Sequence, residues 1–322
     1  MLELELTVQD LASTRFGVSP LWEVVASVRV LRQPGAHAAN RPWAEQVRPR
    51  LAGVDWRLLA DLVPAPGRHI PGFIAPPQPI QVPDFETELA ALRAVPAAVV
   101  RAGIDGLSPP ISDRLAGLRD DPPRGLARLA ETIRGYWDAA LAPYWPRMLT
   151  LLEGDILHRA RLLAEGGAQR LFNDLDPAVR WDADRLRVAH RFASGSVRLA
   201  GRGLLLAPSV FNWPRVSSIV EPPWQPTLRY PPRGIGTLWE RRHRDLPAGL
   251  ARVLGRSRAR LLAELDAPAA TTALAHRTGL TPGAVSQHLT ALRDAGLVTP
   301  HRTGRLVLYA RTRTAEALLA GG

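Results

Sequence analysis

The chain has 322 residues, of which 46% are hydrophobic, so it can build a sizeable core and is not disordered by composition. It contains no cysteine, which excludes disulfide bonds and thiolate metal sites and is typical of a reducing compartment. The formal net charge is +11, and no apolar run is long enough to span a membrane. The N-terminus is acidic and alternating, unlike a signal peptide, so we expect a cytoplasmic protein without membrane contact.

The first elements are predicted by alternation and by capping residues. Apolar and acidic residues alternate from Leu2 to Thr7, as in a half-buried strand, and Thr7 is placed to cap a short helix that ends at Leu11. Ser19 followed by Pro20 is a strong helix start. Two further helices are expected over residues 41–53 and 55–63.

A segment rich in proline and glycine, residues 63–84, is predicted to connect these helices to a second helical region. That region extends to about Asp174 and is broken once, near Pro143 and Pro146. Short segments of β character follow, at residues 186–193, 195–201 and 202–211. Residues 1–240 are therefore expected to form an α+β domain, mainly helical with a small β-sheet.

The pattern changes near residue 240, where we place a domain boundary. Helical periodicity returns, and residues 240–322 carry 13 arginines against 6 acidic residues, an excess that favours polyanion binding. No Trp or Phe follows Trp239. Residues 241–322 are therefore predicted to be a separate basic domain.

This domain has the element order of a winged helix-turn-helix. A short helix over 271–278 ends at Gly279, and Thr281 caps a second helix that begins at Pro282 and ends near Ala295. Ala275 is small where the two helices must approach. Alternation around Thr303 and Gly304 then predicts a β-hairpin, the wing. The fold class is thus α+β, with a winged helix-turn-helix domain at the C-terminal end.

The second helix has an apolar stripe at helical spacing and an opposite polar face. With Val285, Leu289 and Leu292 turned inward, short polar side chains and one arginine turn outward. On a helix in the major groove they would meet base edges and phosphates, and Gln287 has the geometry to pair with adenine. The predicted DNA contacts of this helix are Thr281, Gly283, Ser286, Gln287, Thr290 and Arg293, and those of the wing are His301, Arg302, Thr303 and Arg305.

At these residues the module resembles the ArsR family of winged-helix regulators. The resemblance covers residues 245–318 and is carried by "LTPGAVSQHLTALRDAGLVTPHRTGRLVLYA". It implies a homodimer that binds an inverted repeat of double-stranded DNA and releases it when an effector binds. The cysteine pair of the metal-sensing members corresponds to Ala270 and Thr272, and the terminal helix lacks the zinc-sensing set, so no metal and no cofactor is expected. The N-terminal stretches "STRFGVSPLWEVVASVRVL" and "GRGLLLAPSVF" resemble an uncharacterised domain fused to such modules in high-GC bacteria.

Aromatic residues at helical spacing are the candidate effector site. Side chains of this kind usually form core, but a regulatory domain without metal ligands needs a cavity in order to sense a molecule. We expect an apolar or aromatic small molecule there, against Trp22, Tyr136, Trp137, Tyr144, Trp145 and Met148.

The sequence therefore favours a DNA-binding transcriptional regulator, a homodimeric repressor released by a non-metal small molecule. No nucleophile elbow, dinucleotide fingerprint or phosphate loop is present, so we expect no enzymatic activity. Two alternatives stay open. The N-terminal domain could be an enzyme that a DNA-binding module regulates or targets, or the chain could bind DNA without responding to a ligand.

Overall fold

The computed structural model describes residues 1–64, 70–77, 83–182, 184–189, 194–239, 248–265, 268–303 and 306–320. The chain divides into two compact units. Unit one comprises Met1–Tyr144 and Arg159–Trp239, and unit two comprises Trp145–His158 and Glu240–Gly322. The expected fold class, a mainly helical region with small sheets followed by a winged helix-turn-helix, is confirmed.

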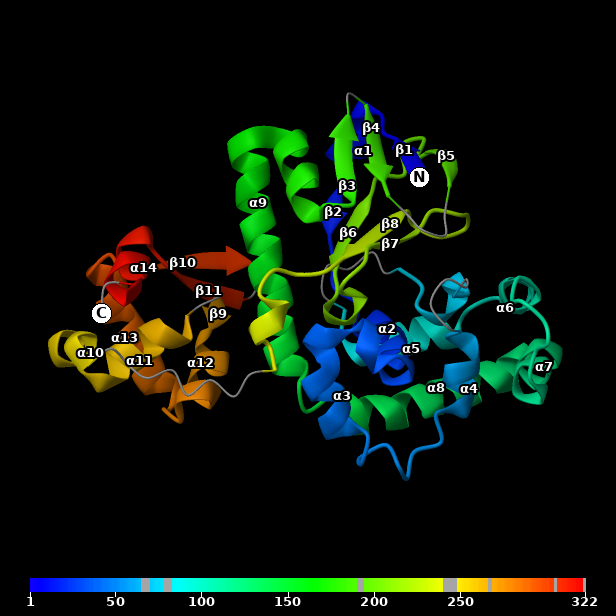
Figure 1. Ribbon diagram of the computed structural model, residues 1–322, viewed down its shortest axis with the longest axis horizontal. Coiled ribbons are helices and arrows are strands. Elements are labelled where there is room, and N and C mark those ends of the chain that lie inside the picture. Colours follow the sequence, from blue (N-terminus) through cyan, green and yellow to red (C-terminus); the bar gives the residue numbers. More distant parts are fainter. Residues whose placement is uncertain are drawn as a thin grey trace. The chain divides into compact units, whose positions relative to one another are not determined.

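Apart from α1, which lies by the strands, the first eight helices form a layer around α2 and α8, which pack against each other and against most of the other helices (Figure 1). Helix α2 begins as expected, because Ser19 Oγ accepts from the Trp22 amide and Pro20 occupies the first turn. The helices are α1 (Val8–Ala12), α2 (Pro20–Arg32), α3 (Arg41–Val47), α4 (Arg57–Leu62), α5 (Phe85–Arg93), α6 (Ala97–Asp105), α7 (Asp113–Asp120) and α8 (Pro122–Ala140).

Two of the predicted helical segments need correction. The helix expected over 41–53 ends at Val47, where Pro49 lacks an amide hydrogen and disfavours a helical residue before it. The last helix, α9 (Trp145–Leu175), is interrupted at Gly166 and Gly167, and Gly167 has a φ of +67°. The buried Arg159 donates to the carbonyl and carboxylate of Asp174, which holds the segment after the interruption against the segment before it.

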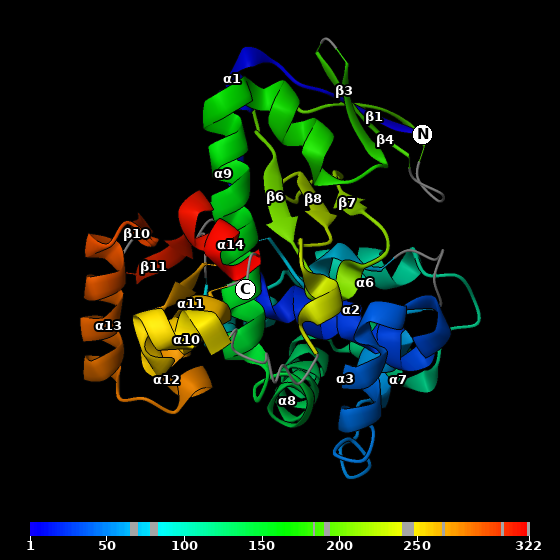
Figure 2. The ribbon, with the colours of Figure 1, turned by 60° about the vertical axis from the view of Figure 1, so that its left-hand side comes forward.

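Unit one contains two four-stranded sheets rather than one small sheet. Sheet A has the order β3 (Val179–Asp182), β4 (Arg185–Val188), β1 (Leu2–Glu5), β5 (Gly195–Arg198). Sheet B has the order β2 (Arg15–Phe16), β6 (Leu205–Pro208), β8 (Thr227–Tyr230), β7 (Ser217–Ile219). Both contain strands from the N-terminal end, so neither sheet forms from the late segments alone (Figure 2).

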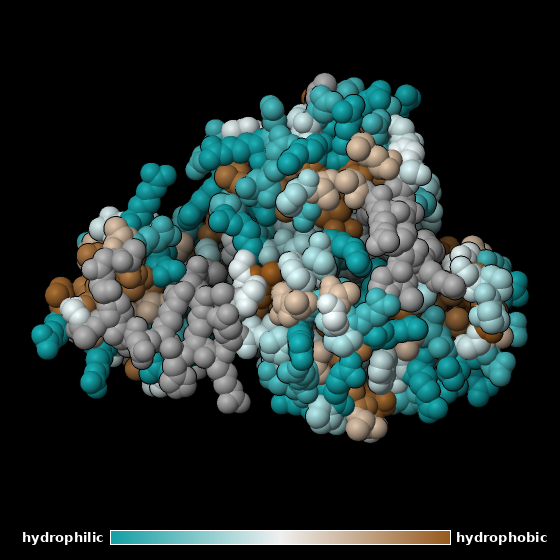
Figure 3. All heavy atoms as spheres, viewed as in Figure 1, coloured by the Kyte–Doolittle hydropathy of each residue, from teal (hydrophilic) through white to brown (hydrophobic). Residues whose placement is uncertain are grey.

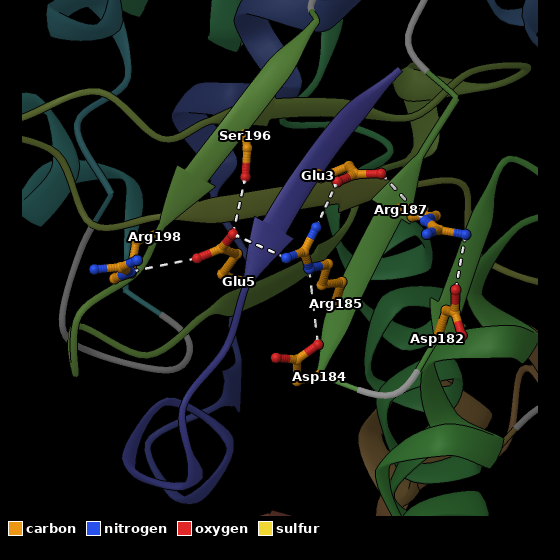
Figure 4. A network of polar contacts seen from close by, with 8 residues as sticks. All are labelled: Glu3, Glu5, Asp182, Asp184, Arg185, Arg187, Ser196 and Arg198. Carbon is orange, nitrogen blue, oxygen red and sulfur yellow. Dashed lines mark hydrogen bonds and ion pairs between the residues drawn. The ribbon is translucent and has the colours of Figure 1, made fainter.

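The alternation of the first strand is explained by its place in sheet A. Leu2 and Leu4 are buried in a core that lies between the sheets and the last turns of α9. Glu3 and Glu5 face outward, between arginines of β4 and β5, and form ion pairs of 3.2–3.5 Å with them (Figure 4). These pairs are partly exposed and therefore weakly stabilising, but they neutralise the acidic face of the strand.

The surface of the face shown in Figure 3 is mostly hydrophilic, with hydrophobic side chains in small scattered areas. Among the helices that the structure describes, none is both long and apolar enough to cross a membrane. In the same described ranges, no three His, Cys, Asp or Glu side chains gather as a metal site requires.

Candidate nucleic-acid interface

The helix-turn-helix of unit two is formed by α12 (Thr271–Thr278) and α13 (Pro282–Asp294). Gly279 ends α12 in the left-handed region, at φ +71°, and its amide donates to the Ala275 carbonyl at 2.9 Å. Thr281 caps α13, with its hydroxyl accepting from the Ala284 amide at 3.3 Å. The turn residues expected from the sequence therefore make the turn that the motif requires.

One face of α13 is packed into the core of unit two. Val285, Leu289 and Leu292 are buried, and they belong to one hydrophobic cluster with residues of α11 (Arg256–Glu264) and α12. Ala275 is also buried in this cluster, at the approach of α12 and α13. This packing fixes which side chains of α13 point to solvent.

The opposite face of α13 is exposed to solvent. Ser286, Gln287 and Thr290 are exposed, and their side chains form no hydrogen bond with any residue that the structure describes. Thr281 and Gly283 are exposed at the start of the same helix, while His288 is half-buried. The polar groups of this face are therefore available to an external partner.

Arg293 is exposed at the last turn of α13, but it already has a partner. Its Nε and Nη2 atoms donate to Asp294 Oδ1 at 3.0 and 2.8 Å. This neighbouring carboxylate reduces the positive charge that the end of the helix presents. The helical pattern of the sequence did not predict this pair.

The wing is an antiparallel hairpin of β10 (Val298–Thr303) and β11 (Leu306–Arg311). A short strand, β9 (Ala269–Ala270), extends it along β11. His301 is half-buried, and its Nε2 lies 3.1 Å from the Thr299 hydroxyl. Arg302 and Thr303 lie at the end of β10, whereas Arg305 lies outside the described residues.

The aromatic residues predicted to hold an effector are divided between the two units. Tyr136 and Trp137 are packed in the helical layer of unit one, where Tyr136 Oη lies 2.8 Å from Ser27 Oγ and Trp137 stacks on Phe85 at 4.3 Å. Tyr144 is also in unit one, and its hydroxyl donates to Gln46 Oε1 at 3.2 Å. Trp145 and Met148 are grouped with unit two, and Met148 is buried.

Trp22 has a different environment from the other five. Its ring lies under the guanidinium of Arg229, with 3.8 Å between the guanidinium carbon and the ring centroid. Arg229, Glu23 and Glu88 are all buried around the first turns of α2. Sequence reasoning missed these three charged residues; the one available signal was an arginine inside the apolar strand "TLRY".

Comparison with known proteins gives two matches. A model described as a helix-turn-helix domain matches residues 255–301, and a family of unknown function (DUF5937) matches residues 111–235. Neither the curated proteins nor the solved structures contain a match to the chain. The helix-turn-helix domain is therefore confirmed, and it follows a domain whose relatives have no assigned function.

Proposed function

We propose that the chain is a DNA-binding transcriptional regulator in which α13 is the recognition helix. The observation that carries this proposal is the exposed face of α13, where Ser286, Gln287 and Thr290 have no partner among the described residues. Amide and hydroxyl groups on such a face are the groups that read base edges in the major groove. The arginine excess of residues 240–322 supplies attraction to phosphates.

The finer proposal is a homodimeric repressor of the ArsR type that binds an inverted repeat. Two recognition helices on a symmetric dimer would enter successive major grooves, one helical turn apart. A non-metal small molecule would then release the DNA by favouring a conformation in which the two helices no longer match that spacing. Unit one is proposed to act by binding this molecule and not by catalysis.

The experiment is a fluorescence-anisotropy titration of the full chain on the DNA upstream of its own gene, against scrambled DNA at the same salt concentration. Selective binding that weakens in Gln287→Ala is expected, with a loss of about 1–3 kcal/mol and relaxed preference at one base pair. Replacing Arg302 should instead weaken binding to both DNAs and lower the salt slope by about one. Equal affinity of the native chain for both DNAs would contradict the proposed autoregulation.

A further inference from the structure

A small cavity lies on one face of sheet B, beside the start of α2. In the parallel strands β6 and β8, Leu205 pairs with Thr227 and Ala207 with Arg229, which places these side chains on the same face. They line a cavity of about 20 Å³ together with residues that precede α2 and with Glu88 of α5. We call it the Arg229 pocket; its lining includes Ser19, Ala75, Glu88, Leu205, Thr227 and Arg229.

Arg229 is the unusual member of this lining. The residue is 5% exposed, and its guanidinium stacks on Trp22. Within the part of the chain that the structure describes, the guanidinium donates no hydrogen bond and forms no ion pair. Buried arginines are normally paired, because five desolvated N–H donors are costly to leave unsatisfied.

Glu88 is close enough to act on Arg229 through space, but its carboxylate is engaged elsewhere. Its Oε2 accepts from the Leu21 amide at 2.6 Å, and the Ser19 side chain also donates to it. Burial raises the pKa of Glu88 to about 8, against the opposing effect of these hydrogen bonds and of Arg229. Glu88 therefore holds its proton more readily than an ordinary carboxyl group, and it neutralises the Arg229 charge only in part.

We propose that the Arg229 pocket binds the carboxylate group of a small organic acid, held by two parallel hydrogen bonds from the Arg229 guanidinium. The planar guanidinium fork matches a carboxylate, and the Trp22 ring covers one side of the guanidinium. A cavity of about 20 Å³ has room for about one water-sized group, so only the carboxylate head would enter it and the rest of the acid would stay outside. Glu88 lines the same cavity.

In the regulator proposed above, this pocket would be the effector site, and the effector would be an organic acid. That step rests on the proposed function, whereas binding of a carboxylate does not. The Arg229 pocket differs from the effector site expected from the sequence, which consisted of aromatic residues and Met148. Trp22 is the one residue that the two sites share.

The test uses the full chain and sodium acetate as the probe. Acetate is expected to raise the thermal unfolding midpoint with saturation, while sodium chloride at equal ionic strength and acetamide, the neutral isostere, do not. Arg229→Lys keeps the charge but loses the fork, so the acetate dissociation constant should rise by about tenfold or more. Arg198→Lys, on the exposed face of sheet A, is the matched control and should bind acetate as the native chain does.

The pH dependence provides a readout that a purely structural role of Arg229 would not move. Acetate binding should weaken as pH rises through about 8, because ionised Glu88 would repel the ligand. The charged groups that act on Glu88 are Arg229 and Asp84, and Asp84 is already ionised over this range. Burial also lowers the pKa of Arg229, to about 9, so Glu88→Gln should retain acetate binding and move the pH at which binding weakens from about 8 towards 9.

Measurements on the native chain test the proposal even if a variant does not fold. Stabilisation by acetate no greater than by chloride or acetamide would overturn it, and so would inorganic phosphate binding as tightly as acetate. Equal acetate binding by folded Arg229→Lys would overturn the assignment to Arg229. Saturable acetate binding without selective DNA binding would support the carboxylate site and contradict the proposed regulator. Selective DNA binding without acetate binding would contradict the carboxylate site alone.

Discussion

Arg293 and Asp294, neighbours at the end of the recognition helix, form an ion pair in which Nη2 of the arginine lies 2.8 Å from Oδ1 of the aspartate. Both side chains are about half exposed, so the pair contributes little to stability. Its effect is on the surface proposed to face DNA, where the aspartate would compete with phosphate for Arg293, the one arginine of α13.

Asp294→Asn should therefore strengthen DNA binding. Release of Arg293 adds one phosphate contact, so the slope of log affinity against log salt should steepen by about one. Anisotropy titrations at several salt concentrations measure this slope. Glu316→Gln makes the same change of net charge on α14 (Arg313–Ala320), and an equal gain in that variant would assign the effect to overall charge.

Substitutions at Leu289 and Thr290, neighbours on α13, are expected to affect stability and DNA binding separately. Leu289→Ala removes a buried side chain from the core of unit two and should cost about 2–5 kcal/mol of the free energy of unfolding. Thr290→Ala changes an exposed side chain, so it should leave stability within about 0.5 kcal/mol and still weaken DNA binding. Chemical denaturation and anisotropy on both variants test the pair; loss of stability in Thr290→Ala would mean that this face is not free.

Gly203 is required by a close approach between two backbone segments. It has a φ of +68°, its amide donates to Asp10 Oδ1 at 2.9 Å, and an added Cβ would lie 2.6 Å from the Ser13 carbonyl oxygen. Gly201 also has a positive φ, but a Cβ there would lie 3.7 Å from its nearest neighbour. Both alanine variants bear the cost of the left-handed backbone, so Gly203→Ala should be less stable than Gly201→Ala by about 1–3 kcal/mol. Equal denaturation midpoints would show that Ser13 moves aside.

The stability of unit one should fall as pH rises from about 4.5 towards 7, through Glu23. Burial raises the pKa of Glu23 to about 7 although the Val210 and Phe211 amides donate to its carboxylate at 2.9 and 3.2 Å. Below pH 4.5, the ordinary pKa of the Glu23 carboxyl group in the unfolded chain, Glu23 is protonated in both the folded and the unfolded chain. Between pH 4.5 and 7 the unfolded chain has released this proton and the folded chain has not, so a rise in pH favours unfolding. The loss amounts to a few kcal/mol at most.

Denaturation of the native chain and of Glu23→Gln across this range measures the contribution. The variant lacks one of the two acceptors and should be less stable at pH 5, but its stability should change less with pH. The pKa of Glu88 is also raised, so the free energy of unfolding should retain part of its pH dependence in both the native chain and the variant. Identical slopes would mean that Glu23 is ionised in the folded protein.

Local signals predicted the recognition helix because each of its features is set by neighbouring residues. Thr281, Pro282 and Gly279 fix the start of α13 and the turn before it, and the apolar spacing of Val285 and Leu289 fixes its buried face. The same reasoning identified the start of α2 at Ser19 and Pro20. The DNA contacts and the domain boundary stay predictions.

Features that depend on distant parts of the chain were not predictable in this way. The buried set of Arg229, Glu88 and Trp22 comes from β8, α5 and α2, and apart from Arg229 within "TLRY" no member stands out in the sequence. The interruption of α9 was missed because two adjacent glycines within a helical pattern do not indicate which way the chain turns. The Arg293–Asp294 pair, by contrast, joins adjacent residues, and the pattern of inward and outward faces alone does not predict it.

The pairing of the first strand has a consequence for synthesis on the ribosome. Strand β1 lies between β4 and β5, so residues 2–5 find no partner until residues 185–198 have left the exit tunnel. This segment therefore pairs only after the long stretch of chain that follows it has been made, and the closure of such a long loop slows the completion of sheet A. Changes in residues 2–5 therefore act on an inner strand of a sheet.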